Sequence, residues 1–343
     1  MAIEFQKAIK VARFLDPTNG FAESKRVVEI RTDPLTGRRS RILLDTPHRP
    51  SKPDLAPLIE RSLRCGCPFC PERIAAATPQ FPPSIVPWPR ITVGEATVVP
   101  NITPYDTHSG VCVMTGQHFV GISEFTESLL ANALEAAQAY VRAVMDSDSS
   151  ASYGTINWNY MPLSGGTLIH PHFQIIVGDT PSNYHGELIE GSRRYWESTA
   201  SNYWADLITI EQQLGVRYIA NTGTIHWLMS FAPRGLLEVL AVFANRTSSL
   251  HVSSADWREF AFGLVRIARY LGDLNFHSFN MALFPGRSGD RWYWANARLI
   301  PRYLLTEAFG GSDFNYFGAL HDETLARAIP EDSCRDLRPY FSR

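Results

Sequence analysis

One order of secondary-structure patterns occurs twice along this chain, and the repetition limits the folds available to it. In residues 91–177 we expect two strands, a helix and two more strands, and a similar order returns in residues 226–300. Both expected helices start near a serine, Ser123 and Ser253, followed by acidic residues that suit a helix N-terminus. Their apolar residues, in steps of three and four, are Leu130, Leu134, Ala137, Val141 and Val144 in the first, and Phe260, Leu264, Ile267 and Leu271 in the second.

These patterns predict an α+β protein made of two copies of one unit. We divide the chain into an N-terminal half (1–178), a connecting helical segment rich in Tyr and Trp (179–222) and a C-terminal half (223–343). A hairpin is expected before the first unit, because the apolar runs 27–30 and 42–44 flank the turn-forming residues 33–37. Arg38 and Arg39 follow this turn, and we expect them on a solvated face.

One strand of the first half carries chemical groups that its counterpart lacks. His170, His172 and Gln174 alternate, so on a strand they share one face. Pro171 biases His170 towards extended backbone. Two imidazoles and an amide in one space suit chemistry on a phosphate or a metal. A polar sheet face is the alternative, and the spacing alone does not decide between them. The corresponding strand in the second half reads Asn-Ala-Arg at 296–298.

A Cys-x-x-Cys pair, Cys67 and Cys70, stands in a turn that contains proline. Such a pair can offer two thiolates to one zinc ion, although redox pairs and buried thiols share the spacing. Further ligands must come from elsewhere in the chain, and His118 and His170 are available. We therefore favour a zinc site over a redox or packed pair. The reserve ligands are His108 and Cys65.

Composition excludes several classes of function. A formal net charge of −2 gives no global field for binding nucleic acid or a membrane surface. No apolar stretch is long enough to span a bilayer, and residues 1–10 lack the apolar run of a signal peptide. Five cysteines, three of them within residues 65–70, favour a cytoplasmic protein with a metal site over a disulfide framework.

From about residue 33 to about residue 336, the chain resembles the galactose-1-phosphate uridylyltransferase family of the histidine-triad-like superfamily. The resemblance rests on the order and spacing of short segments that are weak singly. They are DPLTG at 33–37, PHR at 47–49, CPFC at 67–70, VPN at 99–101, HPHFQ at 170–174 and LIP at 299–301. The implied fold is two histidine-triad-like repeats in one chain, with mostly antiparallel sheets flanked by helices.

The resemblance implies ping-pong transfer of a nucleoside monophosphate between a nucleotide sugar and a sugar 1-phosphate. His172 matches the nucleophile that attacks the α-phosphorus to form a covalent nucleotidyl-histidine, which divides one hard displacement into two easier ones. Gln174 matches a phosphate-contacting glutamine. Residues that match substrate contacts are Arg49, Lys52 (an arginine in the family), Asn101, Asn159 and Thr167 (a serine in the family).

In zinc-bearing members of the family, the ligands match Cys67, Cys70, His118 and His170. This gives the two motif histidines different roles, with His170 structural and His172 chemical. The family is commonly dimeric, so we expect a homodimer. Aromatic residues that can form its interface, or equally the core, are Trp196, Tyr203 and Trp204.

The second half departs from the family pattern. The family's second metal site uses a His-x-His where this chain has residues 296–298, so we expect that site to be absent, with Glu187 as its one surviving carboxylate. Residues 314–324 keep the residue pattern of the family but differ at the positions that contact the hexose phosphate. Two alternatives therefore stand beside the transferase: a nucleotide-sugar or dinucleoside-polyphosphate phosphorylase or hydrolase, and a zinc-stabilised nucleotide-binding protein without catalysis.

Overall fold

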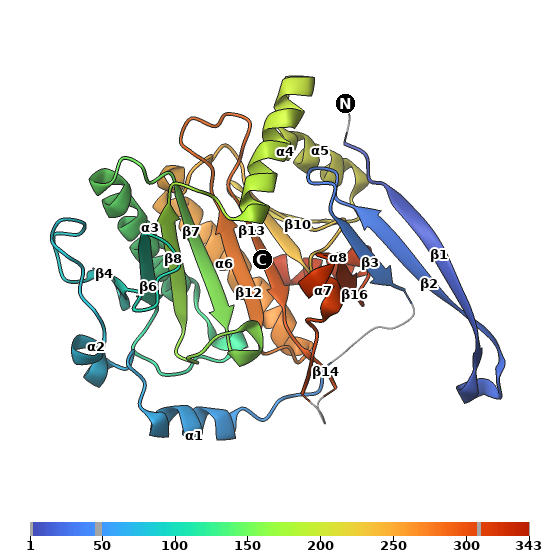
Figure 1. Ribbon diagram of the computed structural model, residues 1–343, viewed down its shortest axis with the longest axis horizontal. Helices are drawn as coiled ribbons and strands as arrows, with labels where there is room; N and C mark the ends of the chain where they lie inside the picture. Colours follow the sequence, from blue (N-terminus) through green and yellow to red (C-terminus); the bar gives the residue numbers. More distant parts are fainter. Residues whose placement is uncertain (1–2, 45–49, 307–309, 343) are drawn as a thin grey trace.

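The computed structural model describes residues 3–44, 50–306 and 310–342, and a ten-stranded sheet built from both halves is its centre (Figure 1). Every neighbouring pair of its strands is antiparallel. In spatial order the strands are β4 (Ile91–Val93), β5 (Ala96–Pro100), β6 (His108–Val113), β8 (His172–Gly178), β7 (Tyr153–Tyr160), β12 (Phe279–Phe284), β13 (Asn296–Pro301), β11 (Val239–Phe243), β10 (Ile225–Met229) and β9 (Tyr218–Thr222).

The strand order is mirrored about the boundary between β7 and β12. Reading outward gives β7, β8, β6, β5, β4 on one side and β12, β13, β11, β10, β9 on the other. The predicted α+β class is therefore confirmed. The two-repeat interpretation and its bounds, 1–178, 179–222 and 223–343, stay predictions.

Two long helices, α3 (Glu127–Ser147) and α6 (Ser254–Asp273), pack against each other and against one face of this sheet. All the residues of their predicted apolar stripes are buried. Ser253 and Asp256 form a capping box at the start of α6, as the sequence predicted. The predicted start of α3 near Ser123 is wrong. Residues 122–124 form a separate 3-10 turn, η2, and Phe125 is extended, so α3 begins only after its cap, Thr126.

Helices α4 (Asn183–Thr199) and α5 (Tyr203–Leu214) cover the C-terminal part of the opposite face. Tyr203 and Trp204 are buried there against strand residues such as Leu240, so they belong to the core and do not supply an interface. The prediction that residues 179–222 are helical fails at their end. Gly215 caps α5 in the left-handed region, and the following residues pair with β10 as strand β9.

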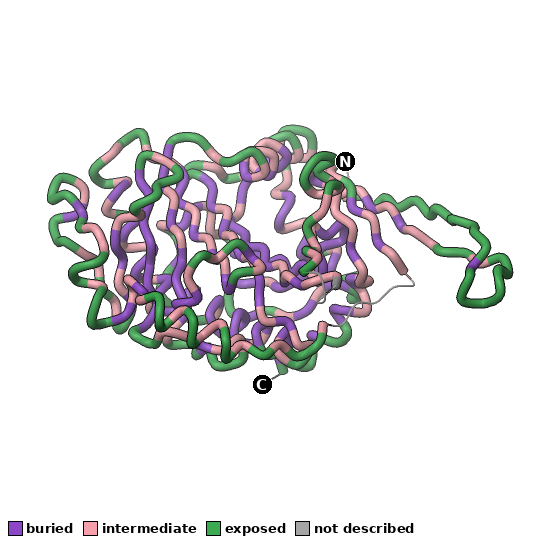
Figure 2. Tube along the Cα trace, turned by 60° about the horizontal axis from the view of Figure 1, so that its bottom comes forward, coloured by how far each residue is buried: buried purple, intermediate pink, exposed green. Residues whose placement is uncertain are grey.

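A second sheet has the order β1 (Lys7–Asp16), β2 (Ala22–Thr32), β3 (Arg39–Leu43) and β16 (Thr324–Ala326). The predicted hairpin is β2–β3, whereas β1 was not predicted. Strands β1 and β2 extend from the body as a largely exposed arm around the turn η1 (Pro17–Asn19) (Figures 1 and 2). Arg38 is not solvated as expected, because it pairs with Glu187 and Asp322, while Arg39 is exposed and pairs with Glu323.

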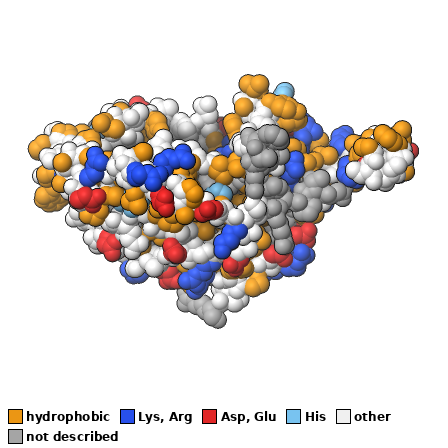
Figure 3. All heavy atoms as spheres, turned by 90° about the horizontal axis from the view of Figure 1, so that it is seen from below, with side chains coloured by type: hydrophobic (Ala, Val, Ile, Leu, Met, Phe, Trp, Pro, Cys, Tyr) orange, Lys and Arg blue, Asp and Glu red, His pale blue; other side chains and the backbone are white. Residues whose placement is uncertain are grey.

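Short elements complete the fold around the ends of the large sheet. They are α1 (Ala56–Cys65), α2 (Pro71–Ala77), η3 (Pro162–Ser164), η4 (Ser249–His251), β14 (Leu304–Thr306), β15 (Gly311–Ser312), α7 (Tyr316–Leu320), α8 (Pro330–Leu337) and η5 (Arg338–Phe341). Seen from below, basic and acidic side chains lie next to one another on the surface (Figure 3). In the described part of the chain, no helix combines the length and apolarity needed to cross a membrane.

Candidate active site and metal cluster

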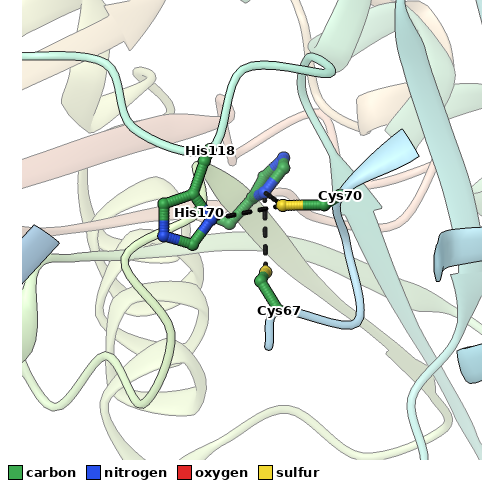
Figure 4. A group of neighbouring side chains, drawn as sticks. All are labelled: Cys67, Cys70, His118 and His170. Atoms are coloured by element: carbon green, nitrogen blue, oxygen red, sulfur yellow. Dashed lines mark hydrogen bonds between the residues drawn. The ribbon is translucent and has the colours of Figure 1, made fainter. Parts of the chain in front are cut away.

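Four predicted ligands come together from separate parts of the chain (Figure 4). Cys67 and Cys70 stand in the turn before α2, His118 in the loop after β6, and His170 just before β8. Their ligand atoms all lie within 4.8 Å of one another. The Cys67 Sγ is 3.6 Å and the Cys70 Sγ 3.9 Å from the His170 Nδ1, and the Cys70 Sγ is 3.3 Å from the His118 Nδ1. This cluster can bind a metal ion.

Hydrogen bonds outside the cluster set which ring nitrogens face the thiols. The His170 Nε2 is 2.8 Å from the carbonyl oxygen of Thr115. A carbonyl only accepts, so Nε2 carries the proton and Nδ1 offers a lone pair to the cluster. The His118 Nε2 contacts the Ser62 hydroxyl at 3.1 Å, and its Nδ1 faces Cys70. Both imidazoles are therefore oriented as ligands.

Burial favours neutral groups in this cluster. It lowers the pKa of His170 to about 4, so this imidazole stays unprotonated near neutral pH. Burial, together with the adjacent Cys67, raises the pKa of the Cys70 thiol to about 11. A cation at the centre would favour the charged thiolate over the neutral thiol, because it stabilises the thiolate directly.

His172, the first residue of β8, has one nitrogen fixed and the other unengaged. Its Nδ1 is 2.7 Å from the carbonyl oxygen of His170, so Nδ1 is the proton donor and Nε2 keeps its lone pair. In the described structure, the Nε2 has no hydrogen-bond partner. The residue is buried, and burial lowers the pKa of the imidazole. A neutral, oriented imidazole with a free lone pair is a competent nucleophile.

Two predicted polar residues share the face of His172. The β7–β8 register pairs Asn157 with Gln174, and a step of two residues along each strand brings Asn159 opposite His172. Gln174 is half-buried beside them. Thr167 is exposed in the loop between the strands. In that loop, the backbone of Gly166 lies so close to β7 that a Cβ would be 2.9 Å from the carbonyl oxygen of Asn159.

The remaining predicted substrate contacts, and the reserve metal ligands, lie in different surroundings. Asn101 is engaged locally, since its Oδ1 accepts from the backbone N–H of Thr103 at 3.0 Å. Lys52 is exposed. Arg49 lies outside the described residues. The reserve ligands are placed elsewhere: Cys65 is exposed, and His108 contacts Asp148 at 2.9 Å.

The region of the family's second metal site holds ion pairs in this chain. Glu187, which matches a carboxylate of the site expected to be absent, forms a two-point ion pair with Arg38. On β13, the Arg298 guanidinium is buried and lies 2.6 Å from the carboxylate of Glu238.

The sequence-based reasoning missed a group of polar residues beside Asn159. Asn280 on β12 donates to the Oδ1 of Asn159 at 2.7 Å. It also lines a cavity of about 210 Å³ with Arg234 and Arg302. A local signal existed, because Asn280 is the one polar residue in the apolar strand Phe279–Phe284.

Comparison with known proteins shows which proteins share this fold. No family model matches the chain. An uncharacterized protein of Archaeoglobus fulgidus is 33% identical over 343 residues, covering 99% of each chain, so the two belong to one family. A GalT-like protein from Arabidopsis thaliana has a TM-score of 0.69 at 16% identity, covering 90% of this chain and 98% of its own. The chain therefore has the fold of this GalT-like protein.

Two further solved structures have a similar fold. An ADP-glucose phosphorylase from Arabidopsis thaliana, with bound ADP-glucose, has a TM-score of 0.68 at 15% identity. A uridylyltransferase has a TM-score of 0.64 at 18% identity. Each comparison covers 91% of this chain and 98% of the other. The predicted family resemblance is thus confirmed at the level of the fold, and the reaction must be argued from this chain's own residues.

Proposed function

We propose that this protein transfers a nucleoside monophosphate from a nucleotide sugar to a sugar 1-phosphate, through a covalent nucleotidyl-His172. The observation that carries the proposal is the contact of His172 with the carbonyl oxygen of His170, which leaves Nε2 as the free lone pair. In the first step, Nε2 attacks the α-phosphorus, the N–P bond forms, and the bond from phosphorus to the bridging oxygen breaks. The sugar 1-phosphate leaves with that electron pair.

The second step reverses the first on a new acceptor. A phosphate oxygen of the acceptor attacks the same phosphorus, and the N–P bond electrons return to Nε2. Since this oxygen is already deprotonated, no proton transfer is needed, and Nδ1 keeps its proton on the His170 carbonyl throughout. Gln174 and Asn159 are the proposed donors to the phosphoryl oxygens, where preorganised donors are most effective. Arg49, Lys52, Asn101 and Thr167 stay proposed substrate contacts.

A second candidate is a phosphorylase, in which orthophosphate is the acceptor. The fold of an ADP-glucose phosphorylase is nearly as similar as that of the GalT-like protein. Residues 314–324, which match the family's hexose-phosphate contacts, are also changed here. Water is a weaker acceptor for this site, because it would need a general base to take its proton.

We propose zinc as the ion of the metal cluster. With Zn–S near 2.3 Å and Zn–N near 2.0–2.1 Å, a tetrahedral site has sulfur–nitrogen edges of about 3.6 Å. The sulfur–nitrogen contacts in this cluster are 3.3, 3.6 and 3.9 Å. The two thiols and two imidazoles match a structural zinc site in number and type. When bound, the ion would fix the segment that presents His172. The homodimer and the cytoplasmic location stay predictions.

The covalent intermediate gives a direct test. The protein is incubated with UDP-, GDP- and ADP-sugars, without acceptor, and its intact mass is measured. We expect an added nucleoside monophosphate, whose mass names the base, in the wild type and in His251→Ala, a control at an exposed histidine. His172→Ala should show no added mass. An adduct that persists in His172→Ala would contradict the assignment of the nucleophile.

The acceptor is then identified from the isolated adduct. Release as a nucleotide sugar on addition of a sugar 1-phosphate supports the transferase. Release as a nucleoside diphosphate on addition of orthophosphate supports the phosphorylase. Tight nucleotide-sugar binding with no adduct and no turnover would favour the third hypothesis, a binding protein without catalysis.

A further inference from the structure

Asn159 lies on β7, the strand next to the one that begins with the proposed nucleophile. It lies on the same sheet face as His172, and residues opposite each other on antiparallel strands have Cβ atoms about 5 Å apart. An amide can present either its oxygen or its NH2 group. The oxygen would repel a phosphoryl group, whereas the NH2 would stabilise it. If Asn159 contacts the phosphoryl group as proposed above, its orientation decides whether it stabilises or repels that group.

Two contacts decide the orientation of Asn280, the neighbour of Asn159 on β12. The Arg302 Nη1 lies 3.1 Å from the Asn280 Oδ1, and the carbonyl oxygen of Ser164 lies 2.8 Å from its Nδ2. A guanidinium can only donate, and a carbonyl can only accept. The Asn280 oxygen must therefore face Arg302 and its NH2 must face Ser164. Turning this amide over would break both contacts.

Asn280 in turn fixes Asn159. The Asn280 Nδ2 lies 2.7 Å from the Asn159 Oδ1, so the oxygen of Asn159 accepts this bond. Its Nδ2 then points away from Asn280 and has no hydrogen-bond partner within the described residues. At the other end, Asp313 holds Arg302 through two contacts, Nε to Oδ2 at 2.9 Å and Nη2 to Oδ1 at 2.8 Å.

We propose that Asp313, Arg302 and Asn280 form a positioning relay by which the C-terminal half turns the NH2 of Asn159 towards the transferring phosphoryl group. The proposal rests on the function proposed for His172. The relay joins residues of both halves, so the half without the histidine motif takes part in the chemistry. Removing one preorganised donor at a developing oxyanion typically lowers the rate by about 10²–10³-fold.

The substitution Asn280→Asp tests the relay. The new carboxylate still accepts from Arg302 but can no longer donate, so Asn159 must turn its NH2 towards it and its oxygen towards the substrate. We expect the rate of adduct formation to fall about 100-fold, with less than a fivefold change in KM. Arg302→Lys, which keeps a donor, should retain more activity than Arg302→Ala.

A matched control removes another hydrogen bond between the same two halves. The Ser278 Oγ donates to the carbonyl oxygen of Tyr160 at 2.7 Å and is not part of the relay. Ser278→Ala should therefore keep the wild-type rate of adduct formation. Rates within twofold of the wild type in Asn280→Asp would overturn the relay.

Failure of the relay can be separated from failure of the proposed function. If the wild type forms no adduct, the proposed function is wrong. The orientation of the Asn159 amide is then measured in the ligand-free protein. ¹⁵N NMR follows solvent exchange of the Asn159 side-chain protons, assigned with Asn159→Asp. We expect fast exchange in the wild type and at least tenfold slower exchange in Asn280→Asp, where the new carboxylate accepts those protons. Equal exchange rates in the wild type and in Asn280→Asp would contradict the proposed orientation of the Asn159 amide.

Discussion

The Nδ1 of His172 donates to the carbonyl oxygen of His170 over 2.7 Å, so one hydrogen bond links the proposed nucleophile to the metal cluster. The His170 ring belongs to that cluster, and its backbone orients the His172 ring. A disturbance of the cluster should therefore reach the nucleophile through two residues of backbone. This connection would give a bound metal ion a positioning role that does not require contact with substrate.

The cluster should bind one zinc ion per chain, and Cys70→Ser should lose it, because a hydroxyl is a poor replacement for a thiolate. Metal content by mass spectrometry and thermal unfolding measure the effect. Binding that favours only the folded state stabilises it by about 4 kcal/mol at a metal concentration 1,000 times Kd. Cys65→Ser is the matched control, since Cys65 lies outside the cluster. Retained zinc in Cys70→Ser, or lost zinc in Cys65→Ser, would refute the ligand set.

Gly166 should tolerate no side chain. An added Cβ would lie 2.9 Å from the carbonyl oxygen of Asn159 and 3.1 Å from that of Met161, both backbone atoms that cannot rotate away. We expect Gly166→Ala to cost about 1–3 kcal/mol, as overpacking usually does. It should also slow adduct formation, because the shift reaches the strand of Asn159. Gly289→Ala, where a Cβ meets open space, is the control. Equal unfolding free energies for both variants would contradict this account.

The alternation of side chains along a strand allowed part of the candidate site to be predicted from the sequence. His172 and Gln174 lie on β8 with the period of two that the sequence predicted, whereas His170 precedes the strand and does not extend that pattern. Ser253 caps α6 through a signal only three residues long. Cys67 and Cys70 mark half of the metal cluster by their spacing. Local patterns of this kind depend on backbone geometry that is fixed within one element.

The relay could not be predicted in the same way. Arg302 contacts Asn280 because β13 lies beside β12, and Asn280 meets Asn159 because β12 lies beside β7. Nothing in the local sequence says which strands are neighbours across the two halves. The same reason explains Arg38, whose partner Glu187 is 149 residues away. Strand β1 was missed because its apolar residues, such as Ile9 and Val11, are exposed and interleaved with charge.

His185 should make the protein less stable in acid. The residue is fully buried, its Nε2 lies 2.7 Å from the carbonyl oxygen of Pro285, and burial lowers its pKa from 6.5 to about 4. The unfolded chain takes up a proton near pH 6.5, whereas the folded chain resists until about pH 4. Stability is therefore full above pH 6.5 and declines as the pH falls towards 4, by up to about 3 kcal/mol.

Urea unfolding at pH 7.0 and pH 4.5 measures this contribution. His185→Gln cannot titrate but keeps a donor for the Pro285 carbonyl, so its loss of stability between the two pH values should be smaller than in the wild type. His251→Gln changes an exposed histidine and should keep the wild-type loss. An unchanged loss in His185→Gln would mean that another group causes the acid sensitivity.

The buried ion pair between Arg298 and Glu238 should show strong coupling in a double-mutant cycle. The two groups are 2.6 Å apart, with side-chain exposures of 8% and 0%. Arg298→Met leaves a buried carboxylate without its cation, and Glu238→Gln leaves a buried guanidinium without its anion. Each single change should cost about 3–5 kcal/mol, because an unpaired buried charge is poorly solvated. The double variant removes both charges and should cost much less than the sum, measured by urea unfolding. Additive costs would show that the pair does not act as a unit.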